Sequence, residues 1–413
     1  MLAPRLAARP LVALFTAGYL APYLLPTTVG RLDAGLPLTA TQAGAIGSAL
    51  LLGSAAAGFA LASRVERIGA RTTARAGLLL AALGYGGAAL TWAVPTVAAG
   101  AVLGGLGSGT VTAVAAQRIA AQRDPHRAST LGLLAVSALA GTIYLALPHL
   151  GPGHGQPFAA NALTALAVWP ATRHLPGRTA APDGARLRAT APRSRLPHLV
   201  PGLVLAAAMP CWSLAQNALW GVSDRIGQAQ AHLTESAVGA VFAVALGAGL
   251  LGVLGAGALG PRLGRALPIG IGTALIAGCV ALSASAAALP AFAAGEIAWN
   301  ALYPVVLSYL IGLAASLDPR GRWAVLVGSA SALGTAAGPL TGSVLSAQAG
   351  FPAMGTLLSG GLLLIAVPMT AVAVHTGRRP AAVVEIDIPV EAPAVPARQA
   401  YDTAAAATAP GVD

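Results

Sequence analysis

The sequence predicts an all-α membrane protein in which twelve membrane-spanning helices form two pseudo-symmetric six-helix bundles. Of its 413 residues, 56% are hydrophobic and only 9% are charged, whereas a soluble domain usually carries about 25% charged residues. Its apolar runs are about 20 residues long and show no strand-like alternation, which selects helices over a barrel. A polar stretch rich in arginine interrupts these runs near the middle of the chain.

Charges and Pro or Gly breaks delimit the predicted spans. The first six are 11–31, 42–62, 74–93, 96–117, 129–148 and 157–173. The second six are 199–221, 235–258, 267–288, 291–314, 323–346 and 353–375. They divide the chain into an N-terminal six-helix bundle (1–176), a cytoplasmic linker (177–197), a C-terminal six-helix bundle (198–376) and a disordered cytoplasmic tail (377–413).

The arginines predict which side of the membrane each loop faces. They gather before the first span and after the even-numbered spans, and the opposite loops carry only Arg31 and Arg225. Because basic residues concentrate in cytoplasmic loops, both termini are expected in the cytoplasm. We expect a multi-pass protein of a bacterial plasma (inner) membrane that works as a monomer, with its first span uncleaved because it is too long for a signal-peptide core.

Several kinds of partner are not expected. The formal net charge is +11, but the arginines sit in short loops and not on one soluble face, so no nucleic acid is expected. The seven histidines fall in predicted loops or span ends and never at the spacing H-x-x-x-H. We therefore expect no metal site, no cofactor and no enzymatic centre.

Two loops at equivalent places in the two halves carry a related pattern. Glu66-Arg67-Ile68-Gly69-Ala70-Arg71 follows span two, and Pro261-Arg262-Leu263-Gly264-Arg265 follows span eight. The first loop resembles the signature between spans two and three of the major facilitator superfamily (MFS), with Glu66 in place of the usual Asp. With six spans in each half, this resemblance covers nearly the whole chain except the tail.

The resemblance implies a secondary transporter whose two bundles rock about a central cavity, so that one site opens alternately to each side. It also implies a conformational latch of Glu66, Arg67, Gly69 and Arg71. Glu66 is expected to face the positive N-terminus of span eleven, near Trp323. Because Pro261 replaces the acid in the second loop, the latch is expected on one side only.

The sequence also limits how such a transporter is driven. All 24 basic residues are arginine, and a standard P-loop needs a lysine to reach the phosphates of ATP. Coupling must then come from an ion gradient, from the solute's own gradient or from another subunit. Drug antiporters of the family carry a Gly-Pro motif in span five, but here the similar run, 334–342, lies in span eleven.

Span ten contains the one ionisable residue that stands out inside the membrane. Glu296, Asn300 and Tyr303 follow one another at i, i+4 and i+7, so they share a helix face. Pro304 is expected to kink the helix beside them. An intramembrane carboxyl group suggests function, and burial disfavours its charged form, so Glu296 is a candidate proton carrier. A structural carboxyl group is the alternative.

Spans one and seven offer further cavity candidates. Tyr19 and Tyr23 lie one turn apart in span one, and Gln216 and Asn217 lie between two tryptophans of span seven. Aromatic rings with an occasional amide suit a mostly apolar or aromatic solute. The alternative is that the rings mark a membrane interface.

These residues predict a secondary active transporter for a small, neutral or weakly charged, partly aromatic solute. Protons are a possible coupling ion, and no anionic-substrate site is expected, since no arginine is predicted deep within a span. Two alternatives stay open, a drug or metabolite efflux antiporter of the same fold and a transport-inactive membrane sensor or scaffold. The direction of transport also stays open.

Overall fold

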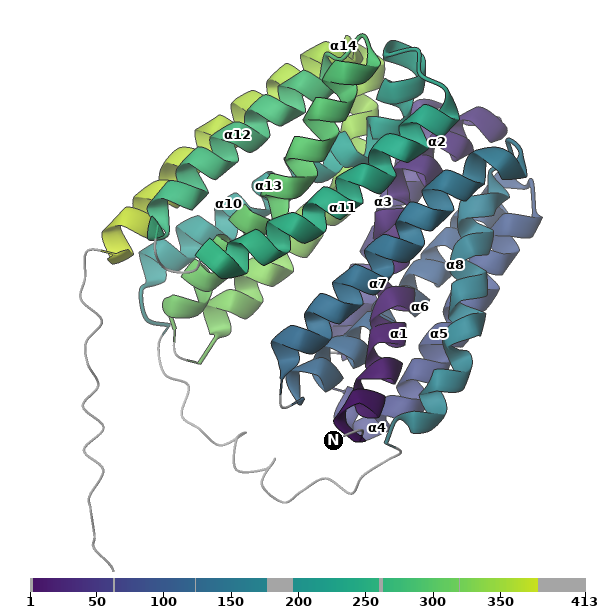
Figure 1. Ribbon diagram of the computed structural model, residues 1–413, viewed down its shortest axis with the longest axis horizontal. Helices are drawn as coiled ribbons and strands as arrows, with labels where there is room; N and C mark the ends of the chain where they lie inside the picture. Colours follow the sequence, from purple (N-terminus) through teal and green to yellow (C-terminus); the bar gives the residue numbers. More distant parts are fainter. Residues whose placement is uncertain are drawn as a thin grey trace, which may run out of the picture. The chain divides into compact units, whose positions relative to one another are not determined.

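The computed structural model describes residues 3–61, 64–122, 124–176, 196–259, 263–318 and 320–377, and within these ranges the chain forms helices and no strands (Figure 1). Most of the predicted linker and of the predicted tail, residues 177–195 and 378–413, lies outside the described residues. The same is true of Pro261 and Arg262 in the second signature loop.

The first half of the chain begins with a broken helix. Helices α1 (Ala3–Tyr23) and α2 (Leu25–Gly35) meet at an angle of 47°. Pro22 and Pro26 flank the break, and proline removes a backbone donor from a helix. The helices that follow are α3 (Ala40–Leu61), α4 (Val65–Ile68), α5 (Ala70–Leu90), α6 (Val94–Ala120), α7 (Pro125–Ala146) and α8 (Gly155–Val168), with 3-10 turns η1 (Leu147–Leu150) and η2 (Trp169–His174).

The second half begins with α10 (Leu199–Arg225), which continues into the π-helical turn η3 (Ile226–Gln230). Next come α11 (Glu235–Leu259), α12 (Ala266–Ala284) and α13 (Leu289–Ser316). The last helix, α14 (Arg322–Gly377), consists of two helices joined at Gly350, where φ is 81° and ψ is 165°. Glycine suits this position because other residues rarely adopt a positive φ.

The helix bounds agree with the predicted spans to within about five residues, except that α1 begins at Ala3 and not at residue 11. Nine helices of the described chain are long and apolar enough to cross a membrane, or ten when α1 and α2 count as one bent span. Twelve crossings result when α14 counts as two and when α8 with η2 counts as one. The chain is therefore an all-α, multi-pass membrane protein.

Arg31 and Arg225 are corrections to the sequence prediction. Arg31 does not lie in a loop, because α2 continues the first span as far as Gly35 and buries Arg31 to 4% exposure. Arg225 is the last residue of α10, and its neighbour Asp224 is 3% exposed. Both arginines lie near helix ends, so the prediction that no arginine lies deep within a span is not contradicted. Both arginines have partners on other helices.

Small residues let the helices approach closely. Helix α3 packs against α14, and α2 packs against α10. Helix α7 packs against α11, and Figure 1 shows these two side by side. A methyl group added at Gly47 would lie 3.4 Å from the Pro339 side chain, and one at Gly338 would lie only 2.5 Å from the Asn217 Cβ. The glycine-rich run of span eleven therefore serves close helix packing, as small residues commonly do in membranes.

Candidate functional site

Aromatic side chains from α10, α11 and α13 form a continuous cluster. Trp212 stacks on Tyr303 with ring centroids 5.3 Å apart, and Tyr303 lies 5.9 Å from Trp299. Trp299 lies 5.5 Å from Trp220, which meets Phe242 edge to face at 5.2 Å. These separations fall in the range of favourable aromatic pairs. Tyr303 was predicted from its helix face, whereas Trp299 and Phe242 were not.

Two amides of α10 have different partners. Gln216 is fully buried, accepts a hydrogen bond from Trp299 Nε1 at 3.1 Å and donates to the Trp212 carbonyl at 3.2 Å. It therefore fixes the Trp299 ring of the aromatic cluster. Asn217 instead donates to the Ser213 carbonyl and to Thr335 Oγ1 of α14 at 3.3 Å. Asn217 thus joins α10 to α14.

Glu296 is fully buried in α13 next to this cluster. Its Oε1 lies 2.8 Å from Ser223 Oγ, and its Oε2 has no hydrogen-bond partner among the described residues. The hydroxyl of Ser223 also lies 3.0 Å from the Leu219 carbonyl oxygen. Asn300 donates to the Glu296 carbonyl and not to its carboxyl group.

The two contacts of Ser223 compete for one hydrogen. A serine hydroxyl has a single hydrogen to donate. When that hydrogen goes to the Leu219 carbonyl, the Ser223 contact with Glu296 is a hydrogen bond only if the carboxyl group carries a proton. When the hydrogen goes to Glu296, an ionised carboxylate is accommodated. The pair can therefore accept either protonation state through rotation of one hydroxyl.

Rings of the first half of the chain approach from the other side. Tyr19 stacks on Phe15 at 4.4 Å, and the carbonyl of Tyr23 accepts a hydrogen bond from the Tyr144 hydroxyl. Tyr303 lies within electrostatic range of both Tyr19 and Tyr23. The structure therefore brings three predicted tyrosines together from α1 and α13.

The four predicted latch residues divide into two groups. Glu66 and Arg67 are exposed, and within the described chain neither forms a hydrogen bond or ion pair through its side chain. Gly69 joins α4 to α5 with a φ of 101°, a conformation that favours glycine. Arg71 donates to the carbonyls of Leu175 and Arg173, at 3.0 and 2.9 Å, and so ties α5 to the end of η2.

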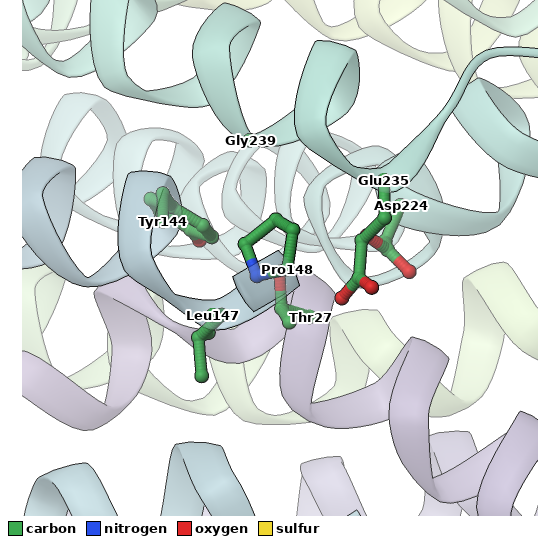
Figure 2. A pocket seen from close by; sticks show the side chains of 7 residues that line it. All are labelled: Thr27, Tyr144, Leu147, Pro148, Asp224, Glu235 and Gly239. Carbon is green, nitrogen blue, oxygen red and sulfur yellow. The ribbon is translucent and has the colours of Figure 1, made fainter. Parts of the chain in front are cut away.

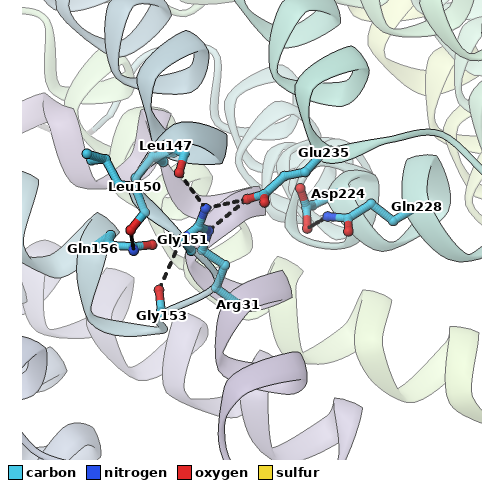
Figure 3. A network of polar contacts seen from close by, with 9 residues as sticks. All are labelled: Arg31, Leu147, Leu150, Gly151, Gly153, Gln156, Asp224, Gln228 and Glu235. Atoms are coloured by element: carbon cyan, nitrogen blue, oxygen red, sulfur yellow. Dashed lines mark hydrogen bonds and ion pairs between the residues drawn. The ribbon is translucent and has the colours of Figure 1, made fainter.

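Arg31 is the centre of a polar network at the end of the molecule where α2 stops and α11 starts, which we call the α2/α11 end (Figure 3). Its guanidinium donates to the carbonyls of Leu147, Gly151 and Gly153 at 2.9 to 3.0 Å. It also pairs with Glu235 of α11 at 2.5 Å. Arg31 is thus held by carbonyls of its own half and by a carboxylate of the other.

A second ion pair crosses the same end. Arg225 of α10 lies 3.6 Å from the Asp33 carboxylate of α2, and it also donates to Ser343 at 2.9 Å. Its ion-pair partner is therefore Asp33 and not the neighbouring residue Asp224. Two ion pairs therefore join the halves. The first half supplies the arginine of one pair, and the second half supplies the arginine of the other.

A small pocket lies beside this network, between the two halves of the chain (Figure 2). Its lining residues are Thr27, Tyr144, Leu147, Pro148, Asp224, Glu235 and Gly239. The lining thus includes two carboxyl side chains and two side chains with a hydroxyl group, Thr27 and Tyr144. In the described part of the chain, no three His, Cys, Asp or Glu side chains converge as a metal site.

The polar contacts between the two halves share one location. Besides the two ion pairs, Trp220 Nε1 donates to the Pro22 carbonyl at 3.1 Å, and the Leu340 N–H donates to Ser48 Oγ at 2.9 Å. Within the described residues, all four contacts lie between the middle of the spans and the α2/α11 end. None of them joins the halves at the opposite end, which carries Glu66.

Comparison with known proteins gives the fold a name. Among solved structures, the human organic anion transporter MFSD10 (TETRAN) superposes with a TM-score of 0.64 and 19% identity, covering 89% of this chain and 99% of that one. A D-xylose-proton symporter superposes with a TM-score of 0.67 and 16% identity, covering 89% and 96%. The chain has the MFS fold. Neither family models nor curated protein sequences give a match to it.

The candidate site is assembled from both halves of the chain. Helices α10, α11 and α13 of the second half carry the aromatic cluster, and α13 also carries Glu296. Tyr19 and Tyr23 belong to the broken first span of the first half.

Proposed function

We propose that this protein is a secondary active transporter that works by alternating access. The observation that carries the proposal is the one-sided set of contacts between the two halves, in which two ion pairs and two hydrogen bonds close the α2/α11 end. Ion pairs that cross an interface can form in one state of a rocking bundle pair and break in the other. The arginine alternation supports placing this closed end outside, so that the described state faces the cytoplasm.

The solute we propose is small, neutral or weakly charged, and partly aromatic. Support comes from the rings of Trp212, Trp299 and Tyr303, which Tyr19 and Tyr23 face from the other half. A ligand ring can stack on such surfaces, and Gln216 holds Trp299 in place by a buried hydrogen bond. The only buried arginine near this region, among the described residues, is already paired with Glu235.

We propose Glu296 as the carboxyl group that couples transport to protons. Its contact with Ser223 accommodates both protonation states through one hydroxyl rotation. In the same scheme, Glu66 forms the latch in the alternate state and is released in the described one, in which it is exposed. The protein is proposed to work as a monomer with cytoplasmic termini.

The transport proposal is tested in proteoliposomes with an imposed pH gradient and three matched probes. Phenyl glucoside is neutral and aromatic, D-xylose is neutral without a ring, and phenyl sulfate is an aromatic anion. We expect gradient-driven accumulation of phenyl glucoside alone. Uptake of only one of the other probes would contradict the proposed solute class. The absence of gradient-driven movement for all three probes would favour a membrane sensor.

The coupling proposal is tested in the same vesicles with Glu296→Gln. This variant keeps the shape of the side chain but cannot carry a proton, so accumulation should be lost while exchange of phenyl glucoside across the membrane persists. Ser223→Ala is the matched control, because it removes the hydroxyl and leaves the carboxyl group. It should retain accumulation with an altered pH profile. Accumulation by Glu296→Gln at the native level would refute the coupling role.

A further inference from the structure

We propose that Asp224 is a second proton-binding site, separate from Glu296, which takes up a proton when the α2/α11 end closes and releases it when that end opens. The inference rests on the proposed alternating access, and it names the proton as the ion that controls closure of the α2/α11 end. It is carried by the position of the Asp224 carboxyl group at the interface between the two halves, beside the pocket of Figure 2.

Asp224 is inserted tightly against the opposite half of the molecule. It belongs to α10, yet its carboxyl group touches the backbone of α2 at Gly30. A methyl group at Gly30 would overlap Oδ2 and would lie 2.9 Å from Cγ. Asp224 is only 3% exposed while the two halves stay together. Separation of α2 from α10 would expose it.

The buried carboxyl group has little to compensate a charge. Its one hydrogen bond within the described chain comes from Gln228 Nε2 to Oδ2, at 2.8 Å, as Figure 3 shows. The nearby arginines are engaged elsewhere: Arg31 with Glu235 and three carbonyls, and Arg225 with Asp33. Burying an unpaired charge is costly, and such a group becomes neutral instead.

The other groups that face Asp224 have opposing effects on the charge of its carboxyl group. Glu235 of α11 shares the pocket, and a second carboxylate disfavours ionisation of the first. Tyr144 of α7 lines the same pocket with its uncharged ring. Arg31 of α2 and the neighbouring Arg225 favour ionisation, but neither forms an ion pair with Asp224 among the described contacts. Asp224 therefore has a carboxyl neighbour in the pocket and no ion-pair partner among the described contacts.

The test measures the distance across the α2/α11 end by pulsed electron paramagnetic resonance in nanodiscs. Spin labels are placed at Leu150 and Ala288, which are exposed and belong to different halves, after the native cysteines Cys211 and Cys279 are replaced. If one proton is linked to closure, the ratio of closed to open protein should change by as much as tenfold per pH unit. The closed population should therefore fall steeply as the pH is raised from 5 to 8.

The decisive variant is Asp224→Asn, which mimics the protonated group. It should stay closed across this pH range, with less than a twofold change in the ratio. Asp33→Asn is the control, because it weakens an ion pair at the same end and should keep the pH response. Glu296→Gln should keep it as well. If Asp224→Asn is poorly folded, Gly30→Ala serves instead, since its methyl group displaces the carboxyl group and should give an open, pH-independent end.

Several results would overturn the proposal. A pH response that persists in Asp224→Asn, or one that is lost in Glu296→Gln, assigns the proton to another group. If the α2/α11 end closes in NaCl but not in choline chloride at the same pH, the pocket binds Na⁺ and not a proton. Opening and closing of the native protein without any pH response removes the proton site but leaves alternating access intact. A label pair that never changes its distance refutes alternating access itself.

Discussion

The ion pair between Arg31 and Glu235 yields a quantitative prediction about the closed end. Replacing Glu235 by Gln keeps the shape of the side chain but removes the charge that faces Arg31. Arg31 keeps its three carbonyl acceptors at Leu147, Gly151 and Gly153, so the variant should fold. What it loses is the contact that joins α2 to α11 across the two halves.

The size of the effect follows from the burial of the two side chains. Fully exposed ion pairs contribute about 0.2–1 kcal/mol, and breaking a fully buried one costs about 3–5 kcal/mol. Here the Arg31 side chain is 5% exposed and that of Glu235 is 30% exposed, so the pair lies between these limits. Because Gln can still accept a hydrogen bond, we expect about 1–2 kcal/mol, which is a factor of about 5–30 in the closed-to-open ratio.

The assay is the distance between spin labels at Leu150 and Ala288, measured at one pH in nanodiscs. Glu235→Gln should raise the open population by the stated factor. Asp33→Asn breaks the longer pair, at 3.6 Å, and should raise it less. Asp124→Asn is the control for loss of one negative charge, since Asp124 caps α7 within a single half. A change below twofold in Glu235→Gln, or an equal change in Asp124→Asn, would refute the reasoning.

Three further predictions concern the site, the packing and the latch. Tyr303→Ala removes a ring that stacks on Trp212. It should weaken binding of phenyl glucoside by about 0.5–1.5 kcal/mol, which tryptophan fluorescence can measure. Unchanged affinity would show that the solute does not bind at this face of α13. Gly338→Ala places a methyl group against Asn217. It should lower the free energy of unfolding by about 1–3 kcal/mol, which a lower Tm in detergent would show. An unchanged Tm would show that α10 and α14 can separate freely. Glu66→Ala should destabilise the state that is closed at the end carrying Glu66. A cysteine introduced at Ala121 should then be labelled faster than in the native background. Equal labelling would argue against the latch.

The fold could be predicted because membrane helices leave a strong local signal. Every backbone polar group in the bilayer must be satisfied within its own helix, so a span appears in the sequence as one long apolar run. The predicted break between spans eleven and twelve, at 346–353, falls on the kink at Gly350. Helix α2 was harder to delimit, because Arg31 looked like the end of an apolar run although the helix continues to Gly35.

The candidate site was predictable only in part. Glu296 and Tyr303 share a face of α13, and the helical period alone made them neighbours. The partners of Glu296 could not be foreseen, since Ser223 belongs to a different helix, 73 residues away. Trp299 next to Asn300 was overlooked, although an aromatic residue one position from the predicted face could have suggested it.

The sequence by itself determined the number, length and expected sidedness of the spans, because these depend on local hydropathy and on where arginine occurs. Only the tertiary structure decided which charges meet: Arg31 with Glu235, 204 residues apart, and Arg225 with Asp33 instead of its neighbour Asp224. These pairings depend on how two halves of the chain pack against each other. Hydropathy does not predict that contact, since it describes how each helix interacts with lipid and not how it packs against other helices.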